Sequence, residues 1–213
     1  MRKQFPQIVY WILISMAACF PAMCAPSGLN VIPTADVLDK ETISLEMESA
    51  GNGRLWEDGC DRFALLQIGV GNGLELGVDR CINDPDSWIN VKWRARDESG
   101  GLPALAFGVQ GISDDELAQP YIALLKSIGN TRLYTGAIMI DRKTRWMFGL
   151  DRPLGSRVTF QADYTSGDDN SITYGIAVSL SKSLSLTLAR SSGNSDETGN
   201  SHVVNLAWSK SLR

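Results

Sequence analysis

Histidine is almost absent from this sequence of 213 residues, which contains only His202. This scarcity argues against a zinc site made of histidines and against a catalytic relay that uses histidine. Basic charge is also limited, because 20 Lys and Arg residues stand against 24 Asp and Glu residues, a formal net charge of -4. Phosphate binding needs a basic footprint, so we expect no nucleic-acid partner. The 8 prolines are too few for a low-complexity linker chain.

Long apolar runs are missing too. The longest near the N-terminus covers residues 8–16, follows a basic start at residues 1–3 and leads into small residues. A run this short does not span a bilayer stably, and the pattern is typical of a secretory signal. We predict a signal peptide over residues 1–24, which makes the mature chain an exported one. In the alternative, residues 16–19 form a lipoprotein box with Cys19 acylated.

Two cysteines, Cys60 and Cys81, remain after this cleavage. In an exported chain an even pair favours a disulfide, and both flank a segment that reads as a hairpin turning at residues 71–73. The alternative is two unpaired thiols in separate loops.

Strict alternation of apolar and polar residues dominates the chain after residue 40. In residues 88–96, for example, Ile89, Val91 and Trp93 alternate with polar neighbours. This period of two is the signature of a strand with two different faces. It predicts about 12 strands, over residues 42–48, 62–70, 73–80, 88–96, 103–112, 119–126, 131–140, 145–152, 157–164, 171–180, 183–188 and 201–209. Four of these, at 62–70, 103–112, 119–126 and 131–140, are ambiguous because both faces contain some apolar residues. In the clear strands the glycines share the polar face, and the same glycine parity places Gly69, Gly108 and Gly136 on the polar face.

The predicted connections alternate between longer and shorter ones. Together with export and an even strand number, this pattern favours a closed up-and-down antiparallel transmembrane β-barrel of the bacterial outer membrane. The barrel domain would cover residues 42–209, after an N-terminal segment at residues 25–41. A soluble exported β-sandwich or lipocalin-like barrel with its apolar face inward remains the alternative, because alternation does not tell inside from outside.

The polar face of the strands carries nearly all of their charge, which suits the lumen of a membrane barrel. One interpretation is a narrow pore whose basic residues attract anions such as acidic sugars; the other is that acids and bases pair across the lumen and close it. Aromatic residues at strand ends or on the apolar face would form interfacial belts: Trp88, Tyr164, Tyr174 and Trp208. The basic group comprises Lys92, Arg94, Arg96, Arg145 and Arg157.

A lipid-modifying hydrolase is a further alternative, because His202 has the parity of a lipid-facing residue at the outer rim. The sequence positions no second His and no acid or amide to orient it, so a rim histidine without catalytic function is favoured. We expect no catalytic residue, no cofactor and no metal site.

The segment Gly28-Leu-Asn-Val-Ile-Pro-Thr-Ala-Asp-Val-Leu38, followed at once by a strand from Thr42, resembles the opening of bacterial outer-membrane β-barrel proteins of the YjbH-like type. The resemblance implies an outer-membrane barrel, connected in some relatives with exported polysaccharide. The function expected from the sequence is therefore a structural or narrow-pore role in the cell envelope. Expected partners are membrane lipid and, through the resemblance, polysaccharide or envelope-assembly proteins.

Overall fold

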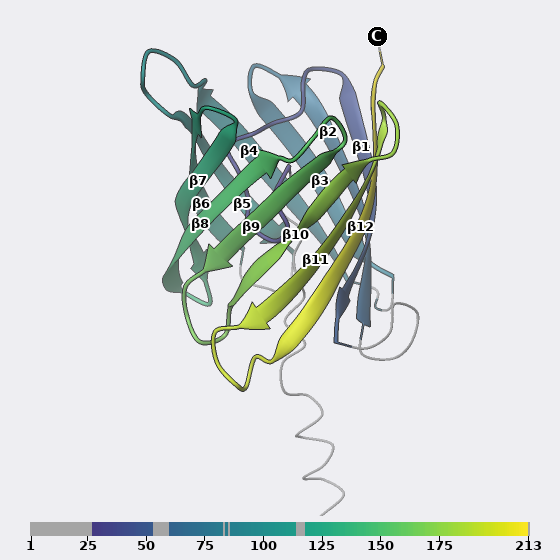
Figure 1. The fold of residues 1–213 in the computed structure, drawn as a ribbon, viewed down its shortest axis with the longest axis vertical. Helices are drawn as coiled ribbons and strands as arrows, with labels where there is room; N and C mark the ends of the chain where they lie inside the picture. Colours follow the sequence, from purple (N-terminus) through teal and green to yellow (C-terminus); the bar gives the residue numbers. More distant parts are fainter. Residues whose placement is uncertain (1–26, 53–59, 83, 85, 114–117, 213) are drawn as a thin grey trace, which may run out of the picture.

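The computed structural model describes residues 27–52, 60–82, 84, 86–113 and 118–212, and these form one closed antiparallel β-barrel (Figure 1). The predicted signal peptide and the Cys19 lipoprotein box lie outside these residues. Within the described residues, no helix is long and apolar enough to cross a membrane. The barrel has twelve strands: β1 (Thr42–Gly51), β2 (Cys60–Gly71), β3 (Leu74–Cys81), β4 (Ser87–Arg96), β5 (Ala104–Ile112), β6 (Gln119–Ile128), β7 (Thr131–Ile140), β8 (Lys143–Pro153), β9 (Val158–Thr165), β10 (Ser171–Ser179), β11 (Leu184–Gly193) and β12 (Asn200–Ser211).

Each strand pairs with its neighbours in the chain, and β1 closes the barrel against β12 with Leu45 opposite Trp208. The predicted fold class and strand number are confirmed. The strand ends differ most at β11, which continues to Gly193 beyond the predicted end at Leu188. Alternation fades in this last stretch, but its backbone still pairs with β10, where Ser171 lies opposite Gly193.

The two ends of the barrel carry different connections. One end holds the start of β1 and the C-terminal end of β12, at the top of Figure 1, and we call it the terminal end. Its connections are residues 72–73, 97–103, 129–130, 154–157 and 180–183. The opposite end, the loop end, has residues 52–59, 82–86, 113–118, 141–142, 166–170 and 194–199. Longer connections thus gather at the loop end, with 97–103 and 141–142 as the exceptions.

The apolar face of the wall points outward. Leu66, Trp93 and Phe148 on this face are each more than two fifths exposed, whereas Glu75, Asn90 and Asp151 on the other face are buried inside. The glycine parity also holds where both faces contain apolar residues: Phe107 and Leu133 face outward, while Ala106 and Tyr134 lie inside. The inward-facing apolar arrangement of a lipocalin-like barrel is therefore wrong for this chain.

Trp88 is an exception to the predicted aromatic belt. It faces inward and packs against Phe63, with ring centroids 6.3 Å apart, in an internal cluster with Leu65 and Cys81. The prediction failed because Trp88 shares its parity with the polar residues Asn90 and Lys92, and position near a strand end does not decide which way a side chain points.

The predicted disulfide between Cys60 and Cys81 is not present, and both cysteines are buried without a bond between them. In the β2–β3 register Cys81 lies opposite Phe63, three residues from Cys60. This offset amounts to about 10 Å along the strand and places the two side chains on opposite faces of the wall. A disulfide needs Cα atoms within about 7 Å, so the strand register excludes it.

Candidate functional site

The N-terminal segment folds into the lumen. Residues 27–38, called here the plug segment, enter from the terminal end just before β1 and reverse in a tight turn, where Leu29 N donates to Ile32 O at 3.0 Å. Gly28 and Pro33 form an isolated bridge beside this turn. Figure 1 shows this stretch as the purple trace that leaves the start of β1 and descends inside the barrel. The lumen is therefore partly filled by the chain's own N-terminal segment.

An ion pair on β3 and β4 holds both arms of the plug segment. Lys92 and Glu75 have fully buried side chains, with Nζ and Oε1 3.6 Å apart. Lys92 Nζ donates to the carbonyl oxygens of Asp36 at 2.6 Å and Ser27 at 3.3 Å. Glu75 Oε2 accepts from Ser27 Oγ and from the backbone N–H of Leu38, both at 2.6 Å. The ion pair therefore supplies hydrogen-bond partners to backbone groups of the plug segment, which is not part of the β-sheet.

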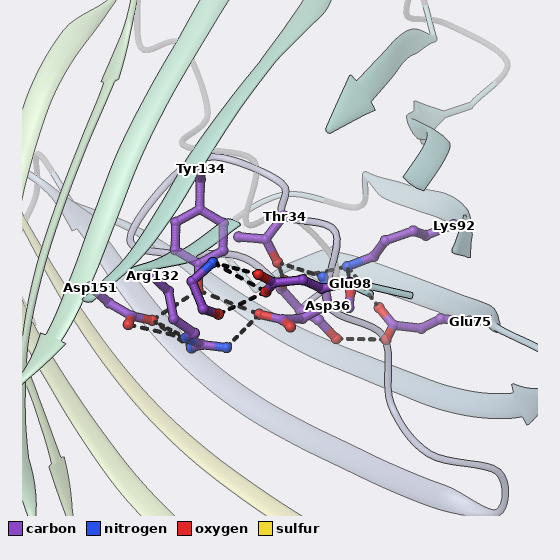
Figure 2. Close-up of polar contacts among 10 residues, drawn as sticks. Thr34, Asp36, Glu75, Lys92, Glu98, Arg132, Tyr134 and Asp151 are labelled. Carbon is purple, nitrogen blue, oxygen red and sulfur yellow. Dashed lines mark hydrogen bonds and ion pairs between the residues drawn. The ribbon is translucent and has the colours of Figure 1, made fainter. Parts of the chain in front are cut away.

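A second anchor lies across the lumen on β7 and β8 (Figure 2). The Asp36 carboxylate accepts from Arg132 Nη1 at 3.0 Å, and Tyr134 Oη lies 3.5 Å from the same oxygen. Arg132 Nε is also 3.0 and 3.1 Å from the two oxygens of Asp151, and Tyr134 Oη donates to Asp151 at 2.9 Å. Asp36 thus joins an existing network of the wall rather than standing alone.

The third anchor holds the turn itself. Asp163 Oδ2 on β9 accepts from the backbone N–H and the side-chain Nδ2 of Asn30, both at 2.9 Å. Both residues are buried. Three anchors on opposite sides of the barrel therefore keep the plug segment in one position.

Small residues of the wall make room for the plug segment. Ile32 and Ala35 are buried against an internal cluster that includes Ala104, Ala106 and Ala123. At Gly149 an added Cβ would collide with the side chains of Leu29 and Ile32. The wall at β5–β8 is therefore shaped to accept this segment, and its interior is packed there.

The opposite side of the lumen is more open. Inward-facing residues of β9–β12 toward the terminal end are small or uncharged and half-buried, whereas many of their counterparts on β3–β7, such as Glu75, Ala104 and Leu125, are buried. This open side narrows toward the loop end, where Thr173, Ser191, Val203 and Asn205 are buried. Its half-buried residues include Thr159, Gln161, Gly175, Ala177, Ser185, Thr187, Ala189, Ala207 and Ser209.

The five basic residues singled out in the sequence do not form one group. Lys92 is buried beside Glu75, and Arg94 Nε pairs with Asp97 at 2.8 Å. Arg145 pairs with Asp169 near the loop end. The other two lie toward the terminal end, where Arg96 Nε donates to the carbonyl of Pro103 at 3.1 Å and Arg157 is exposed in a connection.

Carboxylates and basic groups occur in similar numbers on the inner face of the strands, with seven inward-facing acids against six inward-facing bases. Several of the carboxylates are held by neutral partners: Asn90 Nδ2 donates to Asp79 at 2.7 Å and Asn205 Nδ2 donates to Glu46 at 2.8 Å. The inward-facing acids of the strands are Glu46, Glu48, Asp61, Glu75, Asp79, Asp151 and Asp163.

Sequence reasoning missed the plug segment. The segment Gly28 to Leu38 was the part of the chain with a recognisable motif, but it shows neither strand nor helix periodicity. A signal was present in the small inward residues of β5, β6 and β8, such as Ala106, Ala123 and Gly149, which leave the lumen unfilled unless another segment enters it.

His202 lies on the outward face near the loop end, as its parity predicted. Its hydrogen-bond partner is Cys60, with Nε2 and Sγ 3.6 Å apart, and the two residues flank Gly51 in the strand register. The contact with a thiol, rather than with a serine hydroxyl, differs from the Ser-His pair of the hydrolase alternative.

No protein-family model matches the chain, and no curated protein matches it either. The fold is similar to solved porin structures. The KdgM porin superposes with a TM-score of 0.57 at 12% identity, covering 78% of this chain and 98% of that one. The NanC porin gives 0.54 at 10% identity, with the same coverage. A further KdgM structure is a complex with disordered oligogalacturonate. The comparisons give no support to the YjbH-like type, and at these identities they establish the porin-like barrel fold.

Proposed function

We propose that this chain is an outer-membrane β-barrel of the porin type, a narrow pore without catalytic function whose opening is controlled by its own plug segment. The observation that carries the proposal is the position of residues 27–38. They fill one side of the lumen through polar anchors and leave the side lined by β9–β12 open toward the terminal end.

The outer surface supports a membrane location. Large apolar side chains cover its middle, and aromatic residues gather toward both ends, with Trp93, Phe107 and Trp208 toward the terminal end. Trp146, Tyr164 and Tyr174 lie toward the loop end. Two aromatic girdles around an apolar band are typical of outer-membrane barrels. In this orientation the terminal end faces the periplasm, and the predicted signal peptide would direct export.

The anchors favour a plug that undocks rather than a permanent core. Ion pairs and hydrogen bonds anchor it on three sides, and such contacts can be exchanged for contacts with water at modest net cost. Its apolar packing, through Ile32 and Ala35, is confined to one side of the wall. Small and hydroxyl-bearing residues line the open side, which suits a polar, uncharged solute better than the anions first considered for the basic group. We propose uncharged sugars as the solute class, in keeping with the polysaccharide link implied by the N-terminal motif. The oligogalacturonate of the KdgM complex is an acidic sugar, so the lining of this lumen points to a solute of different charge.

Planar-bilayer recordings test the pore. The variant N30A/D36A removes two plug anchors without touching a strand, and N200A/D196A makes the same chemical changes at exposed residues near the loop end. We expect low conductance from the wild type and from N200A/D196A, and a several-fold higher conductance from N30A/D36A. Absence of conductance in all three proteins would show a closed structural barrel instead.

The membrane location has a separate test. A folded barrel should require detergent for extraction and should migrate differently in boiled and unboiled SDS gels. Extraction without detergent together with identical migration would contradict the membrane proposal.

A further inference from the structure

Charge on the outer face of the wall has a single sign. In the twelve strands every outward-facing residue that carries or can gain a charge near neutral pH is basic, whereas the strand carboxylates face inward. The outward-facing basic residues all lie near strand ends: Arg62, Arg80, Arg190 and His202 toward the loop end, and Lys126, Arg152 and Lys210 toward the terminal end.

The residues toward the loop end form a cluster on neighbouring strands. Arg190 on β11 lies directly opposite His202 on β12, which in turn lies opposite Gly51 on β1. On the other side of β1, Arg80 lies opposite Ala64, two residues along β2 from Arg62. The four residues therefore extend over five adjacent strands, a width of about 20 Å at the spacing of strands in a sheet.

Contacts with neighbouring side chains hold His202 and Arg80 of this cluster in place. Gly51 has no side chain, so His202 Nε2 reaches across β1 to within 3.6 Å of Cys60 Sγ. Arg80 Nη1 donates to Ser87 Oγ at 3.4 Å. Within the described part of the chain no carboxylate pairs with Arg80 or Arg190, and both side chains are exposed. Two guanidinium groups on the outer wall are thus available for an anion.

The depth of the cluster matches a lipid headgroup. Arg190 lies opposite Tyr174, a member of the aromatic girdle toward the loop end, so both stand at the same height on the wall. Aromatic girdles mark the level where acyl chains give way to headgroups. Guanidinium groups form paired hydrogen bonds to phosphate with a geometry that ammonium groups do not match.

We infer that Arg62, Arg80, Arg190 and His202 form a basic surface that binds membrane lipids with phosphate-bearing, anionic headgroups on both sides of β1 at the loop end. The inference rests on the membrane location proposed above. The terminal end offers no equivalent, because Lys126 is paired with Glu98 at 2.9 Å and its basic residues stand on strands that are not adjacent.

Native mass spectrometry of the full mature chain tests this site. The protein is refolded in non-ionic detergent and titrated with an equimolar mixture of phosphatidylglycerol and phosphatidylcholine. We expect several-fold more phosphatidylglycerol than phosphatidylcholine to remain bound. The variant R62Q/R80Q/R190Q should lose this preference, while K126Q/R152Q/K210Q, with the same loss of charge, should keep it. If the triple variant fails to fold, the single variants R80Q and R190Q replace it in the test. Each is expected to lose part of the preference for phosphatidylglycerol.

The outcomes separate the two proposals. A boiled and unboiled gel of each sample establishes whether the barrel has folded in detergent. A folded wild type with no headgroup preference, or equal losses in both triple variants, overturns the lipid site and leaves the membrane barrel intact. A wild type that is soluble without detergent and binds neither lipid overturns both.

Discussion

The two sides of the lumen use the same strand geometry for opposite purposes. On the side of β3–β8, buried charges and small residues are matched to the plug segment, so that the interior resembles a protein core. On the side of β9–β12 the inward residues toward the terminal end are small, uncharged and half-buried, and within the described part of the chain the plug segment is anchored there through the Asn30–Asp163 contact. A closed barrel therefore need not have a uniform interior, because each strand can be matched to a different content of the lumen.

The largest effect is expected from Lys92→Met on the packed side. It leaves the buried Glu75 carboxylate without its counter-ion and removes the donor to two plug carbonyls. Breaking a buried pair in this way costs about 3–5 kcal/mol. The urea midpoint of the heat-modifiable band should fall and protease should cleave the plug segment, whereas Lys210→Met at the outer rim should change neither. An unchanged midpoint would show that the ion pair does not hold the plug.

Gly149→Val should act on the same side with a smaller effect. The new side chain collides with Leu29 and Ile32, and overpacking of this kind costs about 1–3 kcal/mol. Because the plug segment can shift away from the new side chain, we expect the clash to displace the segment and to raise the conductance in planar bilayers more than it lowers stability. Gly155→Val is the control, because nothing lies within 4 Å of its added Cβ. Equal conductance of the two variants would contradict the packing of the plug against β8.

Thr187→Trp tests the open side. Thr187 points inward on β11 toward the unfilled part of the lumen, so a large side chain there should change stability by less than about 0.5 kcal/mol. Added to N30A/D36A, it should remove most of the conductance gained by releasing the plug. Leu186→Trp, on the outward face, should leave that conductance unchanged. If both tryptophans act alike, solutes do not pass along β11.

The smallest effect is expected at Glu98, in a connection at the terminal end. Hydrogen bonds from Lys126 and Ser127 lower the pKa of Glu98 from 4.5 to about 2. Because the folded pKa lies below the unfolded one, its contribution to stability is present above pH 4.5 and is lost as the pH falls toward 2. Glu98→Gln should lower the midpoint slightly at pH 6 and not at pH 2. A difference that persists at pH 2 would contradict this assignment.

The strands were predictable because their signal is local. Eight of the twelve were expected from clear period-two alternation and four from a weaker one, and parity assigned outward residues such as Trp93 and inward ones such as Lys92 correctly. The predictions for Trp88 and for the Cys60–Cys81 pair were wrong for one shared reason. Each was judged by its position near strand ends, whereas the inter-strand register and parity decide which side chains meet.

The contacts of the site were beyond the reach of periodicity. Residues 27–38 have no repeating pattern, and their partners Glu75, Lys92, Arg132 and Asp163 are scattered over β3, β4, β7 and β9. The basic residues predicted to act together are separated for the same reason, since each is neutralised or exposed according to its own position along the wall.

The amino-acid sequence by itself determined the strand number, the segregation of apolar and charged residues onto two faces, and the expectation of a barrel in a membrane. These follow from the alternation of side chains along an extended backbone, which needs no knowledge of the neighbouring strands. Only the tertiary structure decided that the plug segment fills part of the lumen, that the cysteines lie on opposite faces, and that outward basic residues from β2, β3, β11 and β12 lie on both sides of β1. Barrel closure brings β12 beside β1, and this non-local pairing creates neighbours that the linear chain does not reveal.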